Sequence, residues 1–403
     1  MHNDKKTTYF QQLNQALKNH ERTIPSLLID LDQLDKNISV LKASISSSMA
    51  FRIVVKSLPS LELVHYIMEK ASTNKLMVFH QPFLTHLTAS CDDKADVLMG
   101  KPMPIKTAYY YYKNLPKNEL NFNPYQQIQW LVDTTERIQQ YIDLAKKIGQ
   151  QLRLNLEIDV GLHRGGFSNL APLAKALALI QANSKHVSFS GLMGYDPHVV
   201  KLPKLIRSEQ KAFQLSVNFY QQCKDLIQQE FPNLWQDTLT FNGAGSPTIS
   251  LHKEGNSPLN DVSAGSCLVK PTDFDIPTLA RYAPACYIAT PVLKKFSGTT
   301  IPTMEGMKRM LNQINKSNRQ SYFIYGGFWK ADYYYPTGTK ANGLFGNSTN
   351  QTMLNAPPTA NLEVDDFVFL RPHQSEFVFL HFGCILPIRD GELLSAWQLL
   401  RNY

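Results

Sequence analysis

The sequence has 403 residues, of which 43% are hydrophobic and 18% are charged. This composition excludes an intrinsically disordered chain, which would be poor in hydrophobic residues and rich in charge. The length exceeds that of one ordinary core, so it predicts two domains. The formal net charge of +8 is spread along the chain without a basic block, so we expect no nucleic-acid partner.

The cysteines and the lengths of the hydrophobic runs bear on where in the cell the protein works. The cysteines are five in number, without a CxxC pair, which favours a reducing environment over a disulfide framework. No stretch approaches the roughly 18 apolar residues of a membrane span. We therefore expect a cytoplasmic protein with no membrane partner. The cysteines are Cys91, Cys223, Cys267, Cys286 and Cys384.

Strands and helices alternate through the first part of the chain. Residues 7–20 have the apolar spacing of a short amphipathic helix, and PSLLIDLD (25–32) predicts a strand that is followed by a helix over 33–45. Further strand candidates, most of them followed by a helical segment, predict parallel βαβ units, and about eight such units favour a closed (β/α)8 TIM-type barrel over an open sheet. These candidates are residues 51–55, 75–79, 95–99, 128–132, 153–160, 189–195 and 238–244.

The composition changes after about residue 275. Gly, Pro, aromatic and β-branched residues then dominate, as in DFVFLRP and EFVFLHFGCILPIRDGELL, which predicts a C-terminal antiparallel β domain. We expect an N-terminal helical extension over 1–23, a barrel over 24–275 and a β-rich domain over 276–403 that includes the strand near 24–31. Residues 333–358 predict a long loop that is either functional or mobile.

Lys56 directly follows the predicted buried strand at residues 51–55. In a (β/α) barrel, residues at the C-terminal ends of the strands line the active site. A lysine in such a low-dielectric position can act as a nucleophile that forms a Schiff base. The alternative is a strand-end lysine that reaches solvent.

Two further segments place polar groups at predicted strand ends. LNLEIDVGLHRGGF (154–167) runs from a strand into a Gly-rich turn with His163, which could move a proton, and Arg164, which could bind a carboxylate. FNGAGSPTISL (241–251) also ends a strand, and its backbone N–H groups and hydroxyls could cradle a phosphate. Gly265 and Ser266 form another small-residue turn that could close such a site. Each pattern also occurs in plain turns.

Taken together, these motifs resemble the fold-type III enzymes that use pyridoxal 5′-phosphate (PLP), the alanine-racemase-like barrels. The resemblance is closest to the D-threonine aldolase and D-serine dehydratase branch, and it runs from about residue 24 to residue 397. The family's Arg-x-x-x-Lys segment matches Arg52 to Lys56, and its EIDVGxHRxG turn matches Glu157 to Gly166. The motifs occur in the family's order.

The resemblance implies roles for individual residues. Lys56 would carry PLP as a Schiff base, and His163 and Arg164 would act with it in catalysis. Lys330 lies in GGFWKAD, which resembles another family segment. The cofactor contacts implied are Lys56, Arg164, Tyr195, Gly243, Gly245, Ser246, Gly265 and Ser266.

The metal-binding segment departs from the family pattern. In this branch a His and, two residues later, a Cys or Asp hold a divalent metal, whereas here His373 is followed by Ser375. A serine hydroxyl is a poor ligand for zinc or manganese, so we expect no metal, with His373 as the candidate ligand if one binds. Glu376, or His381 with Cys384, could complete such a site instead.

The resemblance implies a PLP-dependent lyase that acts on small D-amino acids, either an aldolase or a dehydratase. An amino-acid racemase and a PLP-binding protein without turnover are the alternatives. The aromatic-rich C-terminal segment further predicts a homodimer, because such a surface favours a protein partner.

Overall fold

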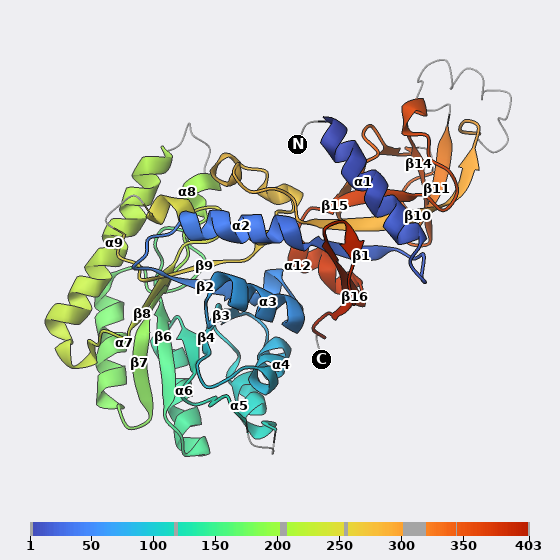
Figure 1. Ribbon diagram of the computed structural model, residues 1–403. Coiled ribbons are helices and arrows are strands. Elements are labelled where there is room, and N and C mark those ends of the chain that lie inside the picture. The colour runs from blue at the N-terminus through green and yellow to red at the C-terminus, as the bar shows by residue number, and fades with distance from the viewer. Residues whose placement is uncertain are drawn as a thin grey trace. The chain divides into compact units, whose positions relative to one another are not determined.

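The computed structural model describes residues 3–116, 120–201, 208–253, 257–300, 320–343 and 345–401. The chain forms two compact units (Figure 1). The sheet unit comprises Met1–Asn37, Val269–Asp275 and Tyr282–Leu399, and the barrel unit comprises Ile38–Leu268, Ile276–Arg281 and Leu400–Tyr403.

The barrel unit is a closed parallel barrel whose strands follow chain order from β2 to β9. Its first and last strands, β2 and β9, pair in parallel and close the cylinder. The predicted TIM-type barrel is therefore confirmed. The strands are β2 (Ala50–Val54), β3 (Lys75–Val78), β4 (Asp96–Met99), β5 (Ile128–Val132), β6 (Leu152–Glu157), β7 (Val187–Gly194), β8 (Thr240–Gly243) and β9 (Asp261–Ala264).

Helices enclose these strands (Figure 1). Ser60 and Thr134 cap α3 and α6 by accepting a backbone N–H bond from the first turn, and Gly149 ends α6 with a φ of +68°. No helix in the described ranges is long and apolar enough to cross a membrane. The helices are α3 (Leu61–Ala71), α4 (Gln81–Ser90), α5 (Ile105–Lys113), α6 (Thr135–Ile148), α7 (Leu170–Ala182), α8 (His198–Lys201), α9 (Glu209–Glu230) and α10 (Ser266–Val269).

The barrel interior contains a buried charged group on β2. Arg52 has no solvent exposure, and its Nε and Nη2 donate to the two carboxylate oxygens of Asp261 on β9, both at 2.9 Å. Its Nη1 donates to the carbonyl oxygens of Leu76 at 3.0 Å and Asp96 at 2.9 Å. Arg52 therefore joins β2 to three other barrel strands, β3, β4 and β9.

The sheet unit is built on a ten-stranded sheet with the order β13-β14-β11-β10-β1-β16-β17. β12 pairs with β15, which also pairs with β10, and β18 pairs with β16. Only the pair of β1 and β16 is parallel among the described strands of this sheet, so the antiparallel domain is confirmed. Its strands are β1 (Ser26–Asp30), β10 (Cys286–Phe296), β11 (Ser321–Tyr325), β12 (Ala331–Tyr335), β13 (Lys340–Ala341), β14 (Gln351–Asn355), β15 (Phe367–Pro372), β16 (Cys384–Arg389), β17 (Glu392–Leu393) and β18 (Trp397–Gln398).

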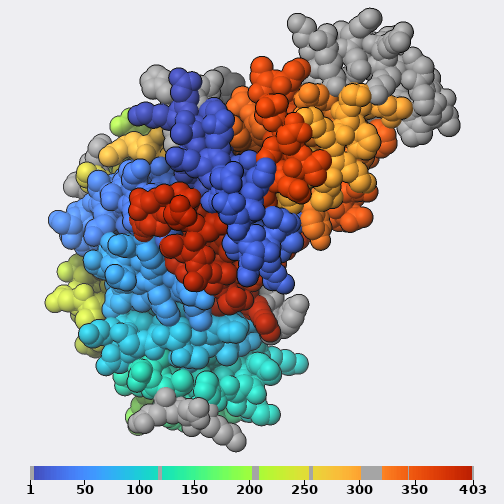
Figure 2. Space-filling model, turned by 45° about the vertical axis from the view of Figure 1, so that its right-hand side comes forward, coloured from blue at the N-terminus to red at the C-terminus, as the bar shows by residue number. Residues whose placement is uncertain are grey.

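The N-terminal helix α1 (Asn3–Lys18) covers part of this sheet. Phe10, Leu13 and Leu17, at helical spacing, are buried in a cluster with residues of β1, β10, β15 and β16. In the space-filling view, α1 (dark blue) lies against the C-terminal strands (red) (Figure 2). The next helix, α2 (Leu31–Ala43), follows β1 directly and continues into the barrel unit.

Two stretches differ from the sequence prediction. Residues 333–358 were expected to form a loop, but β14 pairs with β11 and buries residues 352–355. The run EFVFL was expected to continue the β pattern, but it forms α12 (Ser375–Val378) and begins the 3₁₀ turn η9 (Phe379–His381). A short apolar run does not distinguish a strand from a buried helical turn.

Candidate active site

Lys56 lies at the C-terminal end of β2, in the short 3₁₀ turn η1 (Val55–Ser57). Because the barrel is closed and parallel, the segments after all of its strands meet at this end of the cylinder. The Nζ of Lys56 lies 4.8 Å from the ring centroid of Phe79, which follows β3. Gly100, after β4, faces the same ring, since a Cβ there would lie 2.3 Å from the Phe79 Cζ. Phe79 and Gly100 therefore define one wall beside Lys56.

The Gly-rich turn after β6 is organised by Asp159. One carboxylate oxygen of Asp159 accepts the N–H bonds of Gly161 at 3.0 Å and His163 at 2.8 Å, and the other lies 2.9 Å from the His163 Nδ1. Burial alone would raise the pKa of Asp159, but these bonds lower it. The His163 side chain is 82% exposed, as is typical of a residue in a surface turn. Its catalytic role stays a prediction.

Arg164, Tyr195 and Gly245 are brought together. The Arg164 guanidinium carbon lies 5.0 Å from the ring centroid of Tyr195, which directly follows β7. The same ring lies against Gly245, where a Cβ would lie 2.6 Å from the Tyr195 Cε2. Only glycine leaves room for the ring at that position.

The two small-residue turns predicted to form a phosphate cup also meet. The Ser246 Oγ accepts the N–H of Cys267 at 3.1 Å and that of Gly265 at 3.4 Å. The Ser266 Oγ donates to the Oγ of Ser57, the residue after Lys56, at 3.0 Å. A phosphate oxygen could accept backbone N–H groups from the turn after β9 in the same way as the Ser246 Oγ does.

The backbone at this cup leaves no room for side chains. A Cβ on Gly265 would lie 2.7 Å from the carbonyl oxygen of Val54, and one on Gly243 would lie 2.9 Å from that of Gly194. The donors and the close backbone approach fit the phosphate of PLP. Ser246 and Ser266 would hold that group with the N–H groups of the two turns, and these assignments stay predictions.

Glu157 is the last residue of β6 and faces the turn that carries Arg164. The pKa of Glu157 is raised to about 7, mainly because burial disfavours its carboxylate; Arg164 opposes this shift, and Asp133 and Asp159 add to it. Perturbed carboxyl groups at the C-terminal end of a barrel are typical of functional sites. The structure thus adds Glu157, a carboxyl group with a raised pKa, to the predicted active-site residues.

The remaining predicted residues lie in the sheet unit. The His373 Nε2 lies 2.9 Å from the Asp332 Oδ1, and the His373 N–H donates to the carbonyl oxygen of Lys330. The Lys330 Nζ lies 5.6 Å from the ring of Phe377. Ser375 is fully buried. Over the described ranges, no three His, Cys, Asp or Glu side chains are grouped to hold a metal.

The family model described as alanine racemase, N-terminal domain, matches residues 29–272, which include all of the barrel strands. The chain belongs to this alanine racemase family. Sequence comparison with curated proteins finds no match.

Solved structures of the alanine racemase fold are similar over nearly the whole chain. D-threonine aldolase from Filomicrobium marinum is 13% identical with a TM-score of 0.70, covering 94% of this chain and 97% of its own. D-threo-3-hydroxyaspartate dehydratase from Delftia sp. HT23 is 14% identical with a TM-score of 0.69, covering 96% and 100%. Alanine racemase from Clostridium difficile 630 is 15% identical with a TM-score of 0.68, covering 94% and 99%. The resemblance to fold-type III PLP enzymes is thereby confirmed, and at these identities the likeness concerns the fold.

Sequence reasoning missed three residues of this alanine racemase-like barrel: Phe79, Gly100 and Glu157. Phe79 was placed at the end of a predicted strand, and Gly100 was not considered. The signal that could have found Gly100 is its place directly after β4, the same place that Gly265 has after β9. Glu157 was quoted only as part of a motif, because burial is not visible in the sequence.

Glu157 should make the stability of the cofactor-free protein depend on pH. Its pKa is raised from 4.5 to about 7 in the fold, so the folded state binds more protons than the unfolded state between these values. The free energy of unfolding should therefore fall by about 2 kcal/mol as pH rises from 5 to 8, after allowance for solvent screening. Urea unfolding at both pH values checks this. Glu157→Gln should remove most of the fall, whereas Glu69→Gln, at an exposed position on α3, should not; equal slopes in all three proteins would contradict the assignment.

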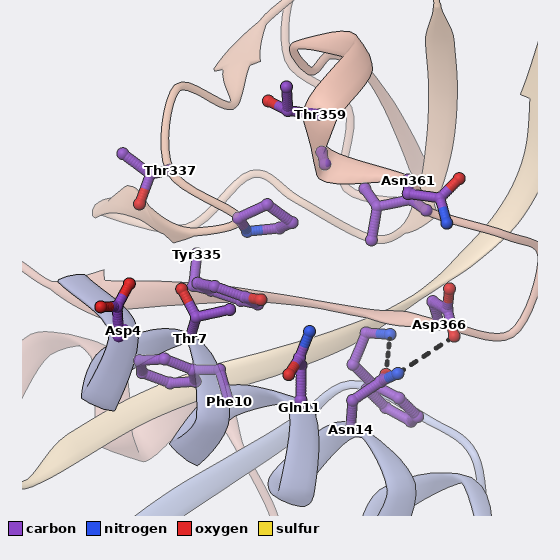
Figure 3. A pocket seen from close by; sticks show the side chains of 14 residues that line it. Asp4, Thr7, Phe10, Gln11, Asn14, Tyr335, Thr337, Thr359, Asn361 and Asp366 are labelled. Atoms are coloured by element: carbon purple, nitrogen blue, oxygen red, sulfur yellow. Dashed lines mark hydrogen bonds between the residues drawn. The ribbon is translucent and has the colours of Figure 1, made fainter.

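A separate cavity of about 430 Å³ lies in the sheet unit, between α1 and the segments that follow β12 and β14 (Figure 3). Phe10 and Tyr335 stack at 5.0 Å on one side of it, and Asn14 donates to Asp366 at 3.0 Å at one end. None of the predicted site residues lines this cavity. The candidate active site is therefore the one at the end of the barrel.

Proposed function

We propose that the chain binds PLP through the Nζ of Lys56 and acts as a lyase on small D-amino acids that carry a β-hydroxyl group. The carrying observation is that the predicted residues form a continuous series of contacts at the C-terminal end of one barrel. This series runs from Arg164 through Tyr195 and Gly245 to the Ser246 turn, and then through Ser266 to Ser57, beside Lys56.

Different residues of the chain would have different roles in such a reaction. When bound, PLP supplies an electron sink for the bond broken at Cα. The Nζ of Lys56 would hold the cofactor and exchange the Cα proton on its own face. Arg164, next to Tyr195, would steady the ring or the substrate carboxylate, and Ser246 with Ser266 would hold the phosphate.

A racemase is the second candidate, because alanine racemases are among the similar structures. Racemisation needs a second acid–base group on the face opposite Lys56, and the sequence does not identify the tyrosine that serves this role in racemases. A PLP-binding protein without turnover is the third candidate. The large sheet unit argues against it, since such carriers consist of a barrel alone.

The visible absorption spectrum of the purified protein tests the cofactor, because a lysine-bound PLP absorbs visible light and free protein does not. A screen of D- and L-amino acids then separates the reactions. Aldehyde release indicates an aldolase, keto acid release a dehydratase, and inversion without release a racemase. If the protein binds PLP but releases none of these products, it is a PLP-binding protein without turnover, and the proposed lyase activity is wrong.

The activity should not require a metal. His373 points its Nε2 at Asp332, and Ser375, in the place of a thiolate or carboxylate ligand, is neutral and fully buried. Treatment with EDTA should therefore change turnover by less than about twofold, because one imidazole alone holds a metal weakly. Metal analysis and activity before and after chelation check this. One tightly held zinc or manganese per chain, with turnover lost on its removal, would contradict the prediction.

We further expect a homodimer in solution. Large apolar side chains on and near β10 and β11 stay exposed, and aromatic side chains are enriched at protein interfaces. Light scattering should give twice the mass of one chain at micromolar concentration, and Phe328→Asp should shift the protein toward the monomer. A monomer with full activity would contradict this expectation. The exposed residues are Leu293, Phe296, Tyr325, Phe328 and Phe345.

A further inference from the structure

Asp196 is a buried carboxylate directly after Tyr195 in the barrel unit. Only 2% of the residue is exposed. Its Oδ1 accepts the hydroxyl of Thr248 at 2.6 Å, and its Oδ2 lies 2.8 Å from the Nε2 of His252. A carboxylate is costly to bury unless such bonds compensate it. These three side chains therefore form one network between the segments that follow β7 and β8.

Thr248 connects this carboxylate to the backbone of the predicted phosphate cup. Its hydroxyl donates to Asp196, so an oxygen lone pair is left to accept the N–H of Gly245, at 3.1 Å. The carbonyl oxygen of Gly245 accepts the N–H groups of Thr248 at 2.9 Å and Ile249 at 3.0 Å. Both polar groups of the Gly245 backbone are thus held by one residue and its neighbour.

The loop that this network holds has a conformation that needs support. Ala244 has a φ of +60°, in the left-handed region that a residue with a Cβ rarely adopts. The adjacent Gly245 is in close contact with the ring of Tyr195. Such a backbone persists only where its surroundings determine it, and Asp196 and Thr248 are part of those surroundings.

His252 extends the network to the segment that leads into β9. Its Nε2 lies 2.8 Å from the Asp196 Oδ2, and its Nδ1 lies 2.8 Å from the hydroxyl oxygen of Ser257. The Ser257 Oγ accepts the N–H of Leu259, whose side chain packs against Gly243. The network therefore reaches the cup loop from both of its sides.

We propose that Asp196, Thr248 and His252 are positioning residues that fix the loop of residues 243–248 in the conformation that binds the phosphate of PLP. This inference rests on the proposed function, since it assigns that loop to the cofactor's phosphate. The competing explanation is that the network stabilises the barrel without bearing on phosphate binding. A phosphate-free ligand distinguishes the two.

The test compares Thr248→Val with Thr248→Ser and with a matched control, Thr88→Val. Thr88 is also buried and loses two hydrogen bonds, to the Leu84 carbonyl oxygen and the Tyr111 hydroxyl, but it lies on α4. Dissociation constants of the cofactor-free proteins are measured for PLP and for pyridoxal, which lacks the phosphate. Thr248→Val should weaken PLP binding at least about tenfold and pyridoxal binding less than about twofold. Thr248→Ser should restore PLP binding, and Thr88→Val should change neither ligand.

Equal weakening of both ligands, or unchanged PLP binding, would overturn the proposal. Asp196→Asn is the second test variant if Thr248→Val does not fold, because it keeps the shape of the side chain but loses one hydrogen-bond acceptor. It should also weaken PLP binding more than pyridoxal binding.

Amide hydrogen exchange in the cofactor-free proteins separates this inference from the proposed function. If the wild type bound neither ligand at Lys56, the proposed function would fail, and exchange over residues 243–249 would still decide the network's role. Faster exchange there in Thr248→Val, but not in Thr88→Val, would support positioning by Thr248. Unchanged exchange would overturn it.

Discussion

Lys56→Ala should reduce turnover by at least about 10³-fold and abolish covalent attachment of PLP, because the variant loses the group that holds the cofactor and exchanges the Cα proton. Lys56→Arg should be equally inactive, since a guanidinium keeps the charge but is not a nucleophile near neutral pH. Turnover and the visible spectrum measure the two losses separately. Lys101→Ala serves as the control, because Lys101 is an exposed residue next to Gly100.

Borohydride reduction followed by peptide mapping identifies the lysine directly. The pyridoxyl group should lie on Lys56. Lys270 is already held inside the sheet unit, where its Nζ donates to the carbonyl oxygen of Tyr282 at 2.8 Å. A label on Lys270 or on Lys330 would show that the assignment of Lys56 is wrong.

Most of the barrel could be predicted from the sequence because its strands are short apolar runs between helices. Strands β2 to β8 all lie within three residues of the predicted ranges at both ends. The exception is β9, Asp261–Ala264, whose sequence DVSA has a single large apolar residue. Its interior side chains bond to other strands, as Asp261 does to Arg52, and no propensity reveals such a strand.

The strand in PSLLIDLD was expected to belong to the β-rich domain, and β1 does pair with β10 and β16 in the sheet unit. What the sequence did not give is the order and register of this pairing. Its partners lie more than 250 residues later in the chain, and register with distant strands is set by packing that local pattern does not contain.

The site was predictable where a motif carried it and not where contacts between distant residues built it. Lys56 and the glycine turns stand in recognisable segments. Asp196 and His252 are 56 residues apart in the chain, and their bond follows only from the closure of the barrel. The raised pKa of Glu157 is similarly a product of burial, which the sequence alone does not give.

Arg52→Met should lower the free energy of unfolding by about 3–5 kcal/mol. Arg52 is fully buried, and its removal would leave the carboxylate of Asp261, itself only 1% exposed, without its bidentate partner. The Nζ of Lys75, 3.5 Å from the Asp261 Oδ2, would remain as a partly exposed partner. A buried carboxylate that loses its bidentate partner is still costly, so the loss should exceed that of an ordinary core substitution. Guanidinium unfolding of the cofactor-free protein measures it.

A double variant separates this charge effect from a loss of packing. Arg52→Met combined with Asp261→Leu removes both charges, so it should recover part of the stability lost in the single variant. Asn242 would lose its 2.6 Å bond to Asp261 but keep the 2.8 Å bond to the Ser263 Oγ. Arg52→Lys should be intermediate, because an ammonium keeps the charge but cannot bond to both carboxylate oxygens and to the carbonyl oxygens of Leu76 and Asp96. A single variant within about 1 kcal/mol of the wild type, or a double variant less stable than the single one, would mean that packing around Arg52, and not its charge, holds these strands together.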